Sequence, residues 1–250
     1  MYQHFILVAS SYTEGARIGF HLSSEKQIEK NIIEDKMKRI TQIKREDVGV
    51  HLLMTDSSDW ESVIKLDSFF EDVIVCPSFE KFEEALMFDS KISAIDVAKF
   101  FLAVKPMSHL KLQKLVYLAY KEYLFKYKTS LFEEKIVAYK YGPVVEEVYQ
   151  TFKEYGADAI KIDDKTDNVE YLLKNIHLPQ AMGRMLLVKD VEKIVPILFK
   201  IIDNYGDFSG GELVDYTHSE KGPWETVYEP YANRKITDEV ILSQAHYEKF

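Results

Sequence analysis

The spacing of hydrophobic residues changes near residue 92, and this change limits which folds are open to the chain. Before this point, short apolar runs typical of strands alternate with helical segments. The strand-like runs are HFILVAS (4–10), ARIGFHL (16–22), VGVHLLM (48–54) and DVIVC (72–76). After it, capped amphipathic segments follow one another, separated by Gly or Pro. We therefore predict an α+β protein, with a small α/β domain at 1–92 and a mainly α-helical domain at 93–250.

The expected helices have recognisable ends. In the first part, Ser23 or Ser24 can cap a helix over 25–43, and shorter helices are expected at 60–70 and 78–88. In the second part, helices are expected at 94–104, 108–128, 143–156, 190–206, 210–218 and 236–250. Pro143 is expected to begin the third of these, and Ser209 and Thr237 to cap the last two. The stretch 135–140 is the one place in this part that could pair as a strand.

Composition excludes several classes of protein. Hydrophobic residues make up 46% of the chain, which is enough for a packed core and excludes a disordered tail. The 41 acidic and 32 basic side chains leave a net charge of −9, which argues against a nucleic-acid partner. The single cysteine, Cys76, forms no intramolecular disulfide or multi-thiolate zinc site. Because the sequence shows no signal peptide and no membrane-length apolar run, we expect a soluble, cytoplasmic protein with no membrane contact.

Motifs for catalysis are missing from the sequence. It has no phosphate loop of the Gly-Lys-Ser type, no paired-histidine zinc helix and no glycine-flanked nucleophilic serine. Arg45 and His51 have the spacing of the Arg-His motif of some small helical ribonucleases, but His51 lies in a predicted strand. Asp56, Asp59 and Glu61 could hold a divalent metal, although a strand-to-helix turn ordinarily needs such residues as caps. We expect no enzyme activity, no cofactor and no metal, with the ribonuclease kept as an alternative.

Four tyrosines recur at near-helical spacing within 108–127, beside a leucine stripe. They are Tyr117, Tyr120, Tyr123 and Tyr127. A buried tyrosine needs a partner for its hydroxyl, so such a row marks either the rim of a core or a protein contact. The core rim is the favoured interpretation. If the chain binds a protein, Tyr120, Tyr123 and Tyr127 are the candidate contact residues, because large rings supply contact area at low rotamer cost.

Two longer strings point to a known family. SHLKLQKLVYLAYKEYLFKY (108–127) and IVAYKYGPVVEEVYQTFKEYG (136–156) closely resemble the signature of the Panacea domain, the antitoxin domain found in SocA-type adaptor antitoxins. AIDVAKFFL (94–102) resembles the opening helix of that domain, and LVDYTHSEKGPWETVY (213–228) with ITDEVI (236–241) resembles its closing segment. The resemblance covers 93–250, and the N-terminal α/β part matches nothing that we recognise.

The resemblance implies a non-enzymatic binding protein. Members of this family neutralise a cognate protein toxin by direct contact, and some deliver the toxin to a cellular protease. The partners to expect are therefore a toxin and, in the adaptor case, a protease, while the oligomeric state stays open. An alternative is a sensing adaptor, in which the α/β domain binds a small ligand or a phage component and the helical domain reports it.

The family motif also falls on polar residues that packing alone does not require. In this sequence they are Gln113, Lys114, Tyr141, His218 and Trp224. They form either a buried network that fixes the fold or part of the binding surface, and the scaffold role is favoured. Gly142 and Pro143 are expected to set a turn and begin a helix. Specificity is expected from variable surface, including the N-terminal α/β domain.

Overall fold

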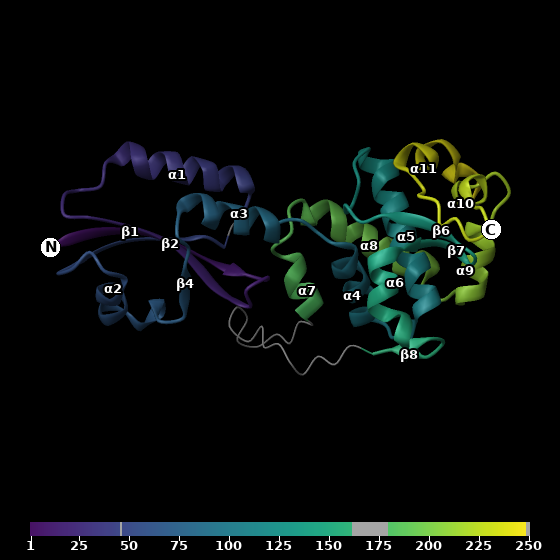
Figure 1. The fold of residues 1–250 in the computed structure, drawn as a ribbon, viewed down its shortest axis with the longest axis horizontal. Helices are drawn as coiled ribbons and strands as arrows, with labels where there is room; N and C mark the ends of the chain where they lie inside the picture. Colours follow the sequence, from purple (N-terminus) through teal and green to yellow (C-terminus); the bar gives the residue numbers. More distant parts are fainter. Residues whose placement is uncertain (46, 162–179, 249–250) are drawn as a thin grey trace. The chain divides into compact units, whose positions relative to one another are not determined.

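The computed structural model describes residues 1–45, 47–161 and 180–248 (Figure 1). The chain divides into two compact units. The first comprises Met1–Lys91 with Leu187–Lys189, and the second comprises Ile92–Leu186 with Asp190–Phe250. A four-stranded sheet lies in the first unit and the second is mainly helical, so the α+β fold class is confirmed. Independent folding of the two units stays a prediction.

The first unit is built on a sheet with strand order β3-β1-β2-β4. The strands are β1 (Tyr2–Ser11), β2 (Ala16–Ser24), β3 (Gly49–Thr55) and β4 (Val73–Val75), at the positions of the four predicted runs. β1 pairs antiparallel with β2 and with β3, whereas β2 and β4 are parallel. The helices of this unit are α1 (Lys30–Ile43), α2 (Trp60–Leu66), η1 (Ser68–Phe70) and α3 (Phe79–Asp89).

Both faces of this sheet are covered, because alternate residues of a strand point to opposite sides. Phe5 and Leu7 of β1 pack in a core with residues of α1 and α3. Ile6 and Val8 pack on the other side with residues of α2 and η1. Figure 1 shows α1 and α3 on one face of the sheet and α2 on the other. The continuous apolar run of β1 is explained by this double coverage.

The first helix begins later than the sequence predicts. α1 starts at Lys30, and its N-cap residue, Glu29, makes no side-chain cap hydrogen bond. Ser23 and Ser24 are not caps, because both belong to β2 and pair with β1 opposite His4 and Gln3. The hairpin ladder extends through these two serines, and the helix begins six residues later, so the capping prediction is wrong. Ser78, in contrast, accepts a hydrogen bond from the backbone of Lys81 at the start of α3.

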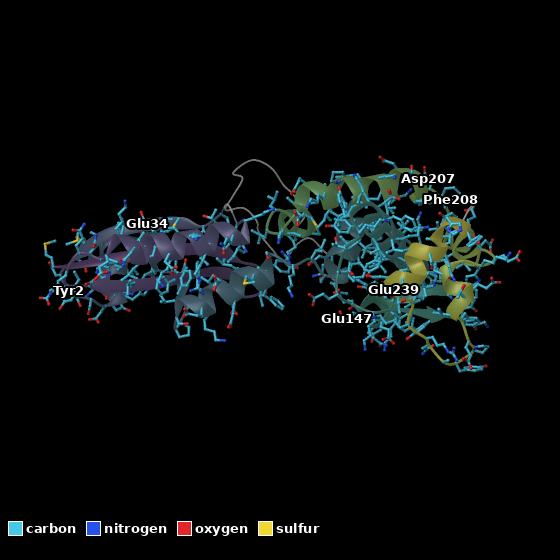
Figure 2. All side chains as sticks on the ribbon, turned by 90° about the horizontal axis from the view of Figure 1, so that it is seen from above. Tyr2, Glu34, Glu147, Asp207, Phe208 and Glu239 are labelled. Carbon is cyan, nitrogen blue, oxygen red and sulfur yellow. The ribbon has the colours of Figure 1, made fainter. Side chains whose placement is uncertain are left out.

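The second unit surrounds one long helix. Its elements are α4 (Ala94–Val104), β5 (Met107–Ser108), α5 (His109–Tyr127), β6 (Ile136–Tyr139), β7 (Gly142–Val145), α6 (Glu146–Phe152), η2 (Lys153–Tyr155), β8 (Ala159–Ile160), α7 (Gln180–Met185), α8 (Val191–Tyr205), α9 (Gly210–Thr217), α10 (Pro223–Val227), α11 (Asp238–Gln244) and η3 (Ala245–Tyr247). Helix α5 contacts α4, α8, α9, α11 and β7. Thirteen of its 19 residues are buried, which makes it the central helix. Figure 2 shows the side chains of the described residues on the ribbon, with Glu147, Asp207 and Glu239 of this unit labelled.

Most helix ends of this unit agree with the sequence, and one does not. Ser209 and Thr237 accept capping hydrogen bonds at α9 and α11, as predicted. Pro143, however, does not begin a helix: it lies in β7, opposite Ala138 of β6, and α6 starts at Glu146. The predicted strand at 135–140 needs a partner, and the neighbouring Gly142–Val145 supplies it as a hairpin. Tertiary pairing therefore overrides the local preference of proline for a helix start.

None of the helices in the described ranges combines the length and the apolar character needed to cross a membrane.

Candidate functional site

The polar motif residues converge where hairpin β6–β7 packs on α5. Lys114 is fully buried, and its Nζ donates a hydrogen bond to the carbonyl oxygen of Pro143 at 3.0 Å. Gln113 is also buried, and its Oε1 accepts a hydrogen bond from the backbone N–H of Val145 at 2.9 Å. Two neighbouring residues of α5 thus hold two residues of β7. The arrangement fixes the hairpin on the central helix.

Gly142 makes this close approach possible. Its φ is +101°, a conformation that favours glycine. A Cβ atom at this position would lie 2.4 Å from Nζ of Lys114 and 2.9 Å from Oγ1 of Thr217, a residue of α9 that is itself fully buried. The absent side chain leaves the space that the lysine ammonium group fills. Gly142 is the first residue of β7 and directly follows the two-residue hairpin turn.

Burial also changes the acid–base behaviour of Lys114. Removal from water lowers the pKa of its amine from 10.5 to about 7, and the carboxylate of Glu248 opposes this shift. The unfolded chain keeps the ordinary value, so between pH 7 and 10.5 it binds more protons than the folded chain does. When the unfolded state binds more protons, stability rises with pH. Lys114 therefore makes the protein more stable as the solution becomes alkaline.

We expect this behaviour to be visible against Lys114→Met, which fills the same space without a titrating group. From pH 7 to pH 9, the free energy of unfolding of the wild type should rise by about 2 kcal/mol relative to that variant. Urea unfolding at several pH values checks this. Lys126→Met, at an exposed position of α5, serves as the control and should follow the wild type. Parallel pH profiles for the wild type and Lys114→Met would contradict the assignment.

His218 and Trp224 form the second half of the polar cluster. Their rings are stacked, with centroids 3.6 Å apart and an interplanar angle of 2°. The ring of Tyr228 also stacks on Trp224, with centroids 4.5 Å apart. The indole Nε1 donates a hydrogen bond to the carbonyl oxygen of Tyr139, which ties this stack to β6. Burial, with a smaller contribution from the charge of Lys114, lowers the pKa of His218 to about 4, so the imidazole is neutral near pH 7.

The structure therefore brings together four of the five predicted cluster residues. Gln113, Lys114, His218 and Trp224 all pack around hairpin β6–β7. Tyr141 lies apart from them: it occupies the hairpin turn and is 58% exposed. Gln113, Lys114 and Trp224 are buried and His218 is half-buried, and Lys114 and Trp224 donate to backbone carbonyl oxygens. This arrangement is consistent with the favoured scaffold role.

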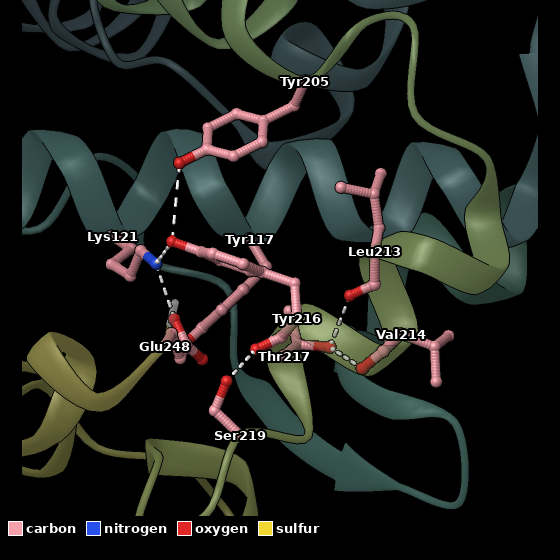
Figure 3. A network of polar contacts seen from close by, with 9 residues as sticks. All are labelled: Tyr117, Lys121, Tyr205, Leu213, Val214, Tyr216, Thr217, Ser219 and Glu248. Carbon is pink, nitrogen blue, oxygen red and sulfur yellow. Dashed lines mark hydrogen bonds and ion pairs between the residues drawn. The ribbon is translucent and has the colours of Figure 1, made fainter. Parts of the chain in front are cut away.

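A second buried polar network lies one turn further along α5, and sequence reasoning missed it (Figure 3). Nζ of Lys121 donates to Oε2 of Glu248 at 2.6 Å and to the hydroxyl of Tyr216 at 3.2 Å. The hydroxyl of Tyr117 donates to Oε1 of Glu248 at 2.9 Å, and the hydroxyl of Tyr205 lies 3.4 Å from that of Tyr216. Tyr117 and Lys121 share one face of α5 at i and i+4, which is the signal that was available. No local sequence pattern predicts that Glu248 is their partner.

The electrostatics of this network follow from its burial. The Glu248 side chain is fully buried, and that burial raises the pKa of its carboxyl group, while the Lys121 ion pair acts in the opposite direction. Burial and the nearby carboxylate raise the pKa of Tyr117 well above its ordinary value, so its hydroxyl stays a donor. Every polar group named here has a partner, which is the condition for a buried network to support a unique fold.

The three tyrosines predicted as contact residues lie mainly in the core. Tyr120 and Tyr123 are 5% and 7% exposed, and Tyr127 is half-buried with its ring 4.8 Å from that of Tyr123. The hydroxyl of Tyr120 donates to Oδ1 of Asp238 at 2.6 Å. These positions agree with the rim of a core, and they leave little ring surface for a partner. A contact role for this row stays a prediction.

The structure separates the two residues of the ribonuclease alternative. Arg45 is buried, and its guanidinium group bonds the carbonyl oxygen of Ser10 and the carboxylate of Asp47. His51 lies on β3 opposite Ile6, with its ring against Phe69 and Phe70. Ser10 and Ile6 are four residue steps apart on β1, which is about 13 Å along a strand. The guanidinium and the imidazole do not form a pair.

Of the three acidic residues after β3, Asp59 is the N-cap residue of α2, but its side chain makes no capping hydrogen bond. Its Oδ2 accepts a hydrogen bond from the hydroxyl of Ser57 at 2.8 Å. No group of three or more His, Cys, Asp or Glu side chains in the described part of the chain is arranged to hold a metal ion. Asp56, Asp59 and Glu61 are among the residues covered by that statement, so the metal alternative gains no support.

A histidine pair in the first unit was also not anticipated. Nδ1 of His4 lies 2.8 Å from Nε2 of His21, and Nε2 of His4 lies 2.8 Å from the hydroxyl of Thr55. Burial, together with the neighbouring His4, lowers the pKa of His21 to about 4. His4 lies on β1, His21 on β2 and Thr55 on β3, so these contacts join adjacent strands of the sheet.

Known proteins are similar to this chain in the region that contains Gln113, Lys114, His218 and Trp224. Residues 112–225 match the family model described as "Antitoxin SocA-like, Panacea domain". The Antitoxin SocA of Caulobacter vibrioides (strain NA1000 / CB15N) is 27% identical over 169 residues, which cover 64% of this chain and 78% of that protein. No solved structure matches the chain. The matched range is narrower than the 93–250 of the sequence resemblance, and the N-terminal part is unmatched.

Proposed function

We propose that this protein, which contains a SocA-like Panacea domain at residues 112–225, is the antitoxin of a toxin–antitoxin pair and neutralises its toxin by direct protein contact. One observation carries the proposal: the two motif strings form a single packed unit. Lys114 and Gln113 of the first string bond Pro143 and Val145 of the second. The similarity in sequence thus falls on residues that shape the core, and a shared core supports a shared mode of action.

The buried cluster also supports a binding role rather than a catalytic one. Its amine is fully buried against a carbonyl oxygen, so it is not presented to a substrate, and its half-buried imidazole has one face covered by an indole. Neutralisation by contact requires no chemistry from these groups. It requires a rigid frame that presents a surface, and the cluster supplies such a frame.

The test is co-expression with the products of the two genes that flank the gene of this protein. Each product is expressed alone and together with this chain, and growth is followed. We expect one flanking product to arrest growth, co-expression to restore it, and the two proteins to co-purify as a complex. The abundance of the toxin, measured on immunoblots, separates the modes of action: a constant level supports neutralisation by contact, and a fall that depends on a cellular protease supports the adaptor role.

Two results would overturn the proposal. If neither flanking product is toxic, the antitoxin role fails and the sensing adaptor becomes the better hypothesis. If this chain itself arrests growth, and Arg45→Ala or His51→Ala relieves the arrest, a nuclease would be favoured despite the separation of these residues.

A further inference from the structure

Two tyrosines of the second unit project into solvent from loops rather than packing. Tyr141 lies in the two-residue turn between β6 and β7 and is 58% exposed. Tyr231 lies between α10 and α11 and is 101% exposed, so its whole ring is in water. Large aromatic rings gain most from burial, and exposed ones are common where a partner docks. These two differ in this respect from the buried tyrosines of α5.

Backbone pairing joins the segments that lead into the two tyrosine loops. The backbone N–H of Ala138 donates to the carbonyl oxygen of Arg234, and that of Ile236 donates to the carbonyl oxygen of Ile136, each at 2.8 Å. Val137 is bridged antiparallel to Lys235. Tyr141 lies four residues after Val137 and Tyr231 lies four residues before Lys235, so both loops leave this antiparallel bridge at the same end. We call residues 140–141 and 229–235 together the tip surface.

The backbone of the tip surface is held in an unusual conformation. Tyr231 has φ of +65° and Asn233 has φ of +45°, both in the left-handed region that few side chains other than glycine and asparagine favour. The fully exposed ring of Tyr231 makes no packing contact that offsets this strain in the free protein. Strained, non-glycine conformations of this kind cluster at functional sites.

Charge indicates what kind of partner the tip surface fits. The chain as a whole has a net charge of −9, yet the tip surface carries Lys140, Arg234 and Lys235 against the single acid Glu229. Glu229 is itself paired with Arg234. The ammonium group of Lys140 lies 5.3 Å from the ring centroid of Tyr141, so the exposed ring is flanked by a cation. Aromatic rings among cations complement carboxylates and apolar side chains on a partner.

We propose that the tip surface is the docking site for the cognate toxin, and that it contacts an acidic segment of that toxin. This inference rests on the antitoxin function proposed above and names the contact surface for it. The surface lies on a frame fixed by the buried cluster, because Trp224 bonds Tyr139 beside the turn. Residues 229–235 lie outside the range matched by the family model, which allows them to differ while the frame is kept.

The test measures the affinity of the full-length chain for the flanking-gene product that arrests growth. Tyr141→Ala, Tyr231→Ala and Lys140→Glu should each weaken binding by at least about tenfold. Tyr155→Ala and Lys153→Glu are matched controls, because Tyr155 is 44% exposed and lies with Lys153 on η2, away from the tip surface in sequence. Both controls should bind within about threefold of the wild type.

A variant that separates binding from folding is Tyr231→Gly. Glycine adopts a positive φ without strain, so this change should leave stability unchanged or raise it while binding falls at least about tenfold. If the three tip variants bind like the wild type to a toxin that this chain neutralises, the docking site is wrong and the antitoxin function stands. If the tyrosine variants lose binding but Lys140→Glu does not, the acidic partner segment is wrong. If no flanking product is toxic, both proposals fall.

Discussion

Replacing Gly142 with alanine should lower the free energy of unfolding by roughly 3 kcal/mol, because two penalties combine at this position. The φ of +101° suits glycine alone, and a Cβ would lie 2.4 Å from Nζ of Lys114. Lys114 cannot swing away without losing its hydrogen bond to Pro143, since it is fully buried. Urea unfolding followed by the fluorescence of Trp224 in a Trp60→Phe background reports on the second unit, because these are the two tryptophans of the chain.

The same substitution at Gly211 is the control for Gly142→Ala. Gly211 lies in the first turn of α9, where a Cβ would meet nothing closer than 3.8 Å, so alanine there should stabilise the helix by about 0.5–1 kcal/mol. Adding Lys114→Met to Gly142→Ala tests the cause of the loss. If the clash with Nζ matters, the double variant should lose less stability than the two single variants together. Strict additivity would assign the loss to backbone strain alone.

Replacing Glu248 with glutamine should cost about 3 kcal/mol, because it leaves the ammonium group of Lys121 buried without a counter-charge. The carboxylate accepts from Lys121 at 2.6 Å and from Tyr117 at 2.9 Å, and its side chain is fully buried. The urea experiment described for Gly142 measures the loss. Glu220→Gln, at an exposed position, should change stability by less than about 0.5 kcal/mol.

A paired replacement distinguishes the charge from the packing at Glu248. Lys121→Met with Glu248→Leu removes both charges and keeps apolar volume, so the double variant should be much more stable than the sum of the single losses implies. Retention of wild-type stability by Glu248→Gln alone would show that the pair is not buried in solution. The expected order is therefore wild type highest, the double variant next because the buried hydroxyl of Tyr117 loses its acceptor, and either single variant lowest.

Local sequence patterns predicted most of the secondary structure. The four strands of the first unit and the long helix α5 lie where periodicity placed them, and the caps at Ser209 and Thr237 are formed. These features depend on residues within a few positions of one another, which is why one sequence suffices to find them. The motif strings led in the same way to the Panacea domain, now matched at 112–225.

Errors arose where a segment could satisfy its backbone in two ways. Ser24 could cap a helix or extend a hairpin, and Pro143 could begin a helix or lie in a strand. The ladder with β1 decided the first choice, and pairing with β6 decided the second. Tyr141 was grouped with Gln113 and Lys114 in one cluster, either buried or on the binding surface, and it lies in the turn with 58% exposure while those two are buried. Neighbouring motif residues can thus have opposite environments.

The sequence by itself determined the two kinds of structure, the order of their elements and the family resemblance, because periodicity, caps and motif strings are properties of short stretches of chain. Only the tertiary structure decided which polar groups are buried and with what partners. Lys114 meets Pro143 across 29 positions, and Tyr117 and Lys121 meet Glu248 across 131 and 127. Contacts over such separations depend on how whole helices pack, so no local pattern encodes them. Burial then lowers the pKa of Lys114 and sets how much free energy of unfolding the loss of the Glu248 carboxylate costs.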